Sequence, residues 1–158
     1  MKILGIDPGM ERLGWGVIEK NGNELKKISS GVKKTLKTSR KSARLLEIFE
    51  FLNKLIKKER PDTLSTEKLF FAKNVKTALI IGEVRGIILT VAEAHGLAIK
   101  EFAPLEVKVA ICGYGRADKQ AVANMVKLML NLPKKELLDD ETDALALAII
   151  GASYKAYP

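Results

Sequence analysis

Four acidic side chains border strongly apolar stretches of this chain, where carboxylates are rarely tolerated: Asp7, Glu67, Asp140 and Asp143. Asp7 ends the apolar run 1–6, Glu67 ends the strand-like segment 63–66, and the other two open the apolar helix 144–150. An ionised carboxylate beside a core is destabilising unless something compensates its charge. A divalent cation would compensate all four at once, and carboxylate oxygens are the ligands that Mg²⁺ prefers.

Each of these signals also has an ordinary structural explanation. The sequence GIDPG at residues 5–9 describes a plain turn at a strand end equally well. Asp140 and Asp143 are three residues apart and so share one side of a helix, but acids at 139–141 also suit a first helical turn, as we expect for Asp139 itself. Glu67 caps no predicted helix. The four signals therefore indicate a metal site mainly when they are taken together.

Composition limits the class of protein. The 158 residues, 47% of them apolar, predict one globular domain over 1–158. The formal net charge of +8 favours a polyanionic partner, although a basic protein without one is the alternative. A single cysteine excludes an internal disulfide, and Asp7 interrupts the apolar start too early for a signal peptide. We therefore expect a cytoplasmic protein that is not in a membrane.

The elements that must position the acids alternate along the chain. Hydrophobic periodicity and turn signals predict five strands, at 2–7, 14–19, 24–33, 62–67 and 97–102. They predict helices at 40–58, 75–95, 104–111, 118–131 and 140–155. This order predicts an α/β protein with a five-stranded mixed sheet and helices on both faces. In such a sheet Asp7 and Glu67 can end adjacent strands.

The predicted helix 75–95 is apolar nearly all round. Its charged residues Glu83, Arg85 and Glu93 argue against a membrane span. Either the helix is completely buried within one domain, or it has a core face and a partner face. Gly82 and Gly86 would allow another helix to approach closely, so we favour a homodimer formed through this helix.

Four motifs, in order, resemble the RuvC family of bacterial Holliday junction resolvases, also called crossover junction endodeoxyribonucleases. They are GIDPG at 5–9, EKLFFAKN at 67–74, GYGRADKQ at 113–120 and DETDALA at 140–146, and the resemblance extends from Lys2 to about Tyr154. It implies an RNase H-like fold, a homodimer and Mg²⁺-dependent endonuclease activity on four-way DNA junctions. It also implies that Asp7, Glu67, Asp140 and Asp143 are the catalytic acids, and that RuvA–RuvB, the branch-migration machinery, is a partner.

Two Mg²⁺ ions, for which Mn²⁺ could substitute, would activate a water and stabilise the departing oxygen. We expect Asp7 to bridge the ions and Glu67 to hold the ion that generates the nucleophile, while Asp140 and Asp143 close the site. The sequence does not decide how the acids divide the ions. As the resemblance implies, each cut should leave a 5′-phosphate and a 3′-hydroxyl.

Several residues are predicted to contact DNA. Lys108 and Lys119 match basic positions of the family, and Lys119 could steady the scissile phosphate; solvent-facing lysines are the alternative. Phe70 matches the family's stacking position and should meet an unpaired base, while Phe71 packs inward; both rings could instead lie in the core. Further predicted phosphate contacts are Arg12, Lys73, Lys76 and Arg116.

Other functions fit parts of the sequence. The turn after Asp7 also resembles that of YqgF-type nucleases, which process RNA, and of sugar kinase and actin-like ATPases. The chain is too short for the second lobe of the ATPases and has no second phosphate-binding glycine motif. A junction-binding module without catalysis would leave Glu67 unexplained. No base-reading residue can be identified, so no preferred cleavage sequence is predicted.

Overall fold

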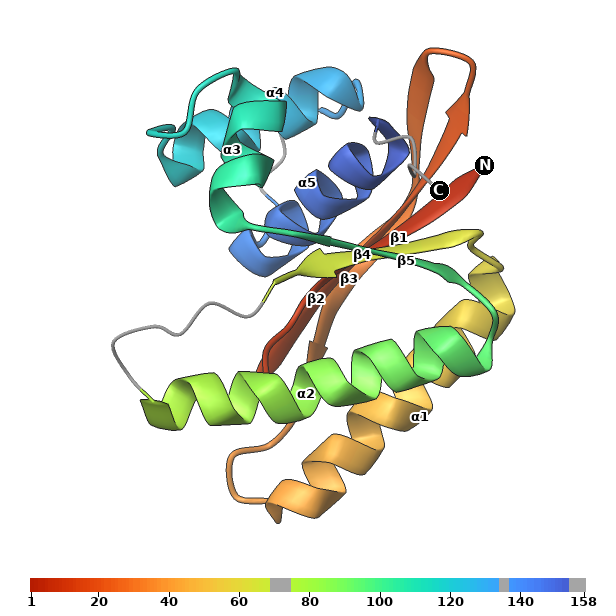
Figure 1. Cartoon of the computed structure of the whole chain (residues 1–158), viewed down its shortest axis with the longest axis vertical. Coiled ribbons are helices and arrows are strands. Elements are labelled where there is room, and N and C mark those ends of the chain that lie inside the picture. Colours follow the sequence, from red (N-terminus) through yellow and green to blue (C-terminus); the bar gives the residue numbers. More distant parts are fainter. Residues whose placement is uncertain (69–74, 134–136, 154–158) are drawn as a thin grey trace.

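The computed structural model describes residues 1–68, 75–133 and 137–153 of the chain. Its sheet has five strands in the order β3-β2-β1-β4-β5 (Figure 1). They are β1 (Lys2–Asp7), β2 (Arg12–Asn21), β3 (Glu24–Lys34), β4 (Thr63–Glu67) and β5 (Ala98–Phe102). The first three strands pair antiparallel, whereas β4 is parallel to β1 and β5 is parallel to β4. The predicted mixed sheet is therefore confirmed.

Helices cover both faces of the sheet, as predicted (Figure 1). One face carries α1 (Lys41–Glu59) and α2 (Val75–Ala94), and the other carries α3 (Pro104–Cys112), α4 (Lys119–Met129) and α5 (Asp139–Ser153). The expected strand 14–19 is longer at both ends, because β2 pairs with β3 through to the Asn21–Glu24 turn. The expected helix 118–131 starts one residue later, since Asp118 is its N-cap.

Strand periodicity decides which face each side chain of β1 and β4 meets. Leu4 and Ile6 of β1 and Leu64 of β4 belong to the core beneath α1 and α2. Ile3 belongs to the second core, beneath α3, α4 and α5. Because successive side chains of a strand point to opposite faces, the odd-numbered acids that end these two strands lie on the α5 side.

Two glycines let α5 lie directly on the sheet. A Cβ at Gly5 of β1 would come 1.9 Å from the Ala144 carbonyl oxygen, and one at Gly14 of β2 would come 1.9 Å from the Asp140 carbonyl oxygen. No side chain fits in either space. The first half of α5 is consequently seated on β1 and β2, at the strand end where Asp7 lies.

The α2 helix has a core face and an exposed apolar face. Val84 and Ile88 are fully buried, whereas Val75 and Leu79 are 68% and 66% exposed. Complete burial within this chain, one of the two alternatives for the helix, is therefore wrong. A Cβ added at Gly86 would meet no atom within 4 Å. Among the described helices, none has the length and hydropathy needed to cross a membrane.

Candidate active site

Asp7 and Glu67 end neighbouring parallel strands, as the sequence predicts. Ile6 of β1 pairs with Thr66 of β4, and the Thr66 hydroxyl donates a hydrogen bond of 3.0 Å to the Ile6 carbonyl oxygen. Each acid is the next residue of its strand. Both carboxylates therefore leave the sheet at the same edge and on the same face.

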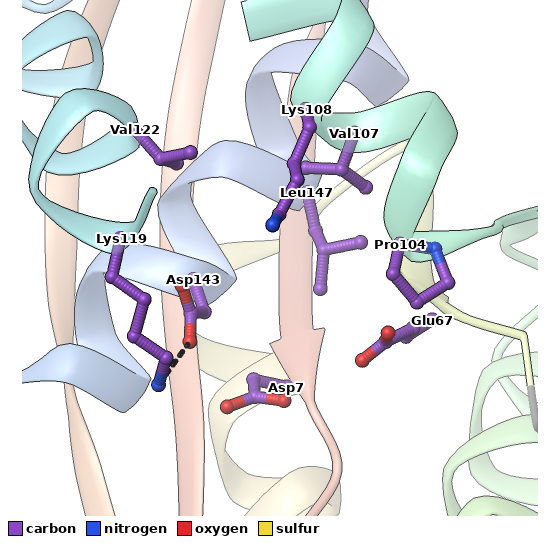
Figure 2. Close-up of a pocket in the computed structure, with 9 residues that line it drawn as sticks. All are labelled: Asp7, Glu67, Pro104, Val107, Lys108, Lys119, Val122, Asp143 and Leu147. Carbon is purple, nitrogen blue, oxygen red and sulfur yellow. Dashed lines mark ion pairs between the residues drawn. The ribbon is translucent and has the colours of Figure 1, made fainter. Parts of the chain in front are cut away.

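Asp143 of α5 approaches the carboxylates of Asp7 and Glu67 from the helix that covers this face of the sheet. The three carboxylates line one cavity of about 200 Å³ between the sheet edge and helices α3, α4 and α5 (Figure 2). Leu147, one helical turn after Asp143, lines the same cavity, and Val107 and Val122 complete its apolar wall. The cavity thus places acidic oxygens against largely apolar surroundings.

Two lysines line this cavity as well, Lys108 from α3 and Lys119 from α4 (Figure 2). The carboxylate of Asp118 accepts a 2.7 Å hydrogen bond from the Ala121 backbone N–H, which fixes the start of α4. This cap makes Lys119 the first helical residue, and its Nζ lies 4.0 Å from an Asp143 carboxylate oxygen. The structure therefore brings both lysines to the acids, as their resemblance to family positions implies.

Crowding of the acids changes their protonation. Burial raises the pKa of Asp7 from 3.8 to about 7; repulsion from Asp143, Glu67 and Asp140 adds to the rise, and Lys119 opposes it. Burial also raises the pKa of Glu67 and of Asp143. Negative charge in this cavity is thus destabilised unless a cation joins it.

Asp140 is held differently from Asp143. Its carboxylate forms an ion pair with the guanidinium of Arg12 on β2, and it is not among the residues that line the cavity. Residues three apart on an α-helix differ by about 60° in direction, enough to send one side chain to the cavity and the other toward β2. The structure therefore directs Asp143 into the cavity and Asp140 toward Arg12, and the proposed ligand roles of both acids stay predictions.

The donor set suits a hard divalent cation, since it consists of carboxylates whose charges are poorly compensated. In their present positions, however, no three His, Cys, Asp or Glu side chains of the described residues are grouped so that they could hold a metal ion. Binding would therefore require side-chain movement. For Asp140 such movement would have to open its ion pair with Arg12.

Two of the remaining predicted DNA contacts, Lys76 and Arg116, are described by the structure and lie away from the cavity. Both are exposed. Phe70, Phe71 and Lys73 lie outside the described residues, so the predictions for them stay predictions.

Sequence reasoning missed Arg85. This α2 residue forms an ion pair with Glu101 of β5, and its positive charge opposes the rise that burial causes in the pKa of Glu67. A lone arginine within an apolar helix is the signal that could have identified it.

Comparisons with known proteins place this geometry in context. The family model described as "Crossover junction endodeoxyribonuclease RuvC" matches residues 3–151. The RuvC protein of Brevibacillus brevis is 43% identical to this chain over 157 residues, which cover 99% of this chain and 95% of that protein. The RuvC protein of Thermosipho melanesiensis is 49% identical over 148 residues, which cover 94% of each. The solved structure "T. thermophilus RuvC in complex with Holliday junction substrate" superposes with a TM-score of 0.90 at 31% identity, over 96% of this chain and 93% of that one. The RNase H-like fold implied by the sequence is confirmed.

Proposed function

Because the chain belongs to the RuvC family, we propose that it is a crossover junction endodeoxyribonuclease that resolves four-way DNA junctions. The observation that carries this proposal is the meeting of three carboxylates, from β1, β4 and α5, in one cavity with two lysines. A phosphodiester repels an anionic nucleophile. A site that gathers acids for cations, with lysines beside them, suits its hydrolysis.

RuvC-family nucleases are metal-dependent, and we propose that the ions here are Mg²⁺, two per site, with Mn²⁺ able to substitute. Such ions would lower the pKa of a water and stabilise the departing oxygen. Asp7, Glu67 and Asp143 would hold them, joined by Asp140 once it leaves Arg12. Ionised Asp7 is required for this role, since a neutral carboxyl is a poor ligand for a hard cation.

The lysines act on the substrate. Lys119 is 77% exposed at its side chain, so it can reach a phosphate while it remains beside Asp143. Lys108, from α3, lines the same cavity. Both would hold the scissile phosphate, which draws negative charge toward acids that would otherwise repel it. Cleavage would leave a 5′-phosphate and a 3′-hydroxyl.

Resolution of a junction needs two symmetric cuts, and a two-fold dimer supplies two equivalent sites. We propose a homodimer that uses the exposed apolar face of α2, where Val75 and Leu79 lie.

We further propose that the protein acts in the cytoplasm beside the RuvA–RuvB machinery. Phe70 would stack on an unpaired base, and Arg12, Lys73, Lys76 and Arg116 would contact phosphates.

One experiment separates the candidate functions. A synthetic four-way junction, a linear duplex and an RNA are each incubated with the protein, with and without Mg²⁺, and the product ends are analysed. We expect paired nicks in the four-way junction and in neither of the other substrates, and only when Mg²⁺ is present. DNA ligase should reseal these nicks, because it joins a 5′-phosphate to a 3′-hydroxyl. Cleavage of RNA alone would favour a YqgF-type activity, and junction binding without cleavage would favour a binding module.

A further inference from the structure

Arg12 and Gly14 lie on the same face of β2, and both meet the first turn of α5. The missing side chain of Gly14 lets the Asp140 carbonyl approach the strand, and Arg12, two residues earlier, pairs with the Asp140 carboxylate. Strand periodicity thus aims one guanidinium at one of the four candidate ligands.

The backbone of this turn is held independently of Arg12. Ser30 of β3 donates a 2.5 Å hydrogen bond to the neighbouring Glu141 carboxylate, and the Gly14 contact seats the carbonyl of Asp140. These contacts would hold the start of α5 on the sheet if the Arg12 ion pair opened. Only the Asp140 side chain needs to turn, and its exposed fraction of 26% leaves room for that movement.

An arginine and a metal ion compete for the same oxygens. A guanidinium keeps its charge at any relevant pH, so the Arg12 ion pair satisfies one oxygen of Asp140 and competes with a cation for that carboxylate. Its side chain is 45% exposed, which leaves it open to a DNA phosphate. Phosphate accepts the guanidinium in the same forked geometry as a carboxylate.

We propose that Arg12 is an internal counter-cation for Asp140, which holds this carboxylate away from the metal site until a DNA phosphate takes over the guanidinium. Cation loading would then be favoured on bound DNA and disfavoured in the free protein. The proposal rests on the proposed nuclease function. In it Arg12 is a positioning residue, since it acts on the reaction through Asp140.

The first test measures cation binding without DNA. Mn²⁺ is titrated calorimetrically into the wild-type protein and into Arg12→Gln, Arg12→Lys and Lys37→Gln. The last is a matched control, because Lys37 pairs with Glu11, the neighbour of Arg12, rather than with Asp140. We expect Arg12→Gln to tighten Mn²⁺ binding by about two- to fivefold, the worth of one partly exposed ion pair, and Arg12→Lys to tighten it less.

Two results would overturn the competition: an effect of Arg12→Gln no larger than that of Lys37→Gln, or the same tightening in an Asp140→Asn background, where no carboxylate is left to release. Thermal unfolding of each variant shows that it is folded. The readout is distinct from the test of the function itself. A wild-type protein that cuts no junction would reject the proposed function, whereas unaltered Mn²⁺ affinity in a protein that cuts would reject only the role of Arg12.

The second test follows the guanidinium onto DNA. Binding of a four-way junction is measured in EDTA over a range of salt concentrations. Transfer of Arg12 to a phosphate predicts that Arg12→Gln weakens binding and reduces the salt slope by about one per protomer. Junction affinity equal to that of Lys37→Gln would overturn the exchange.

Discussion

Arg85 on α2 supplies positive charge to Glu67, the carboxylate that ends β4. Its guanidinium also pairs with Glu101 on β5, and its Nε is buried without a hydrogen-bond partner among the described residues. The side chain is only 14% exposed. A helix with an apolar face open to a partner is therefore linked electrostatically to the candidate active site.

Replacing Arg85 by Gln should raise the pKa of Glu67, because the opposite charge that lowers it is gone. The carboxylate then ionises at higher pH than in the wild type, so the acidic limb of the cleavage profile should shift to higher pH. Loss of the mostly buried pair with Glu101 should also lower the free energy of unfolding by about 1–3 kcal/mol. The measurements are a pH profile of junction cleavage and a denaturant titration.

Two variants control for this change. Arg85→Lys keeps the charge and should restore most of the profile. Lys41→Gln breaks the 2.6 Å ion pair between Lys41 of α1 and Glu83 of α2, the helix that also carries Arg85. This change leaves the surroundings of Glu67 unaltered. A shift of equal size in Lys41→Gln would show that Arg85 acts through the stability of α2 rather than on the acid.

Asp7 should make the cation-free protein less stable as the pH rises. Its pKa is about 7 in the folded protein and near 3.8 when exposed. Between these values the folded state keeps a proton that the unfolded chain has lost, so the free energy of unfolding falls with increasing pH. The loss is complete above about pH 7 and amounts to about 4 kcal/mol at most.

Asp7→Asn removes the ionisable group. The fall in the free energy of unfolding with increasing pH should therefore disappear, and so should the proposed metal ligand. In EDTA the variant should be more stable than the wild type at alkaline pH and similar at acidic pH, as measured by denaturant unfolding. Junction binding should persist and cleavage should disappear. Parallel stability profiles would contradict the burial argument, while joint loss of binding and cleavage would indicate a folding role for Asp7.

The approach of Asp7 to Glu67 could be predicted from local pattern, because two apolar strands that end in an acid place both ends alike in a parallel pair. The position of Lys119 at the site was implied by the resemblance to the family, because its place at the start of a helix does not say which element lies opposite. The different directions of Asp140 and Asp143 could not be predicted. Their spacing allows a shared face, and the choice depends on Arg12, which lies 128 residues earlier in the sequence and meets α5 only through tertiary packing.

Arg85 illustrates the same limit. Its place in an apolar helix is visible in the sequence, but its partners come from two different strands, β4 and β5. Periodicity places a residue on a face of its own element and says nothing of which element lies opposite. For this reason the sequence left two alternatives for α2, complete burial or a core face plus a partner face. The exposure of Val75 and Leu79 excludes complete burial.

Gly14→Ala should displace the acidic turn of α5. The new Cβ would lie 1.9 Å from the Asp140 carbonyl oxygen, a backbone atom that cannot rotate away. We expect a loss of about 1–3 kcal/mol in the free energy of unfolding and a clear loss of cleavage, because Asp140 and Asp143 move together.

The matched control for this change is Gly16→Ala, on the same face of β2. Its Cβ would first meet side-chain atoms of the buried Leu145, Cδ2 at 2.7 Å and Cγ at 2.9 Å, which can shift more easily than a backbone oxygen at 1.9 Å. This variant should lose less stability and keep more cleavage. Equal loss in both variants would mean that the strand, rather than the position of α5, sets the activity.

Leu79→Glu should separate the proposed homodimer. Leu79 is 66% exposed on the apolar face of α2, and a dimer through this face would bury the new carboxylate without a partner, which is strongly unfavourable. Sedimentation at micromolar concentration should show at least about tenfold weaker dimerisation, with loss of paired cuts. Leu128→Glu, at a site on α4 that is 69% exposed, is the matched control and should remain a dimer. A wild-type monomer would contradict the proposed homodimer, and a Leu79→Glu dimer as tight as the control would place the interface on another face.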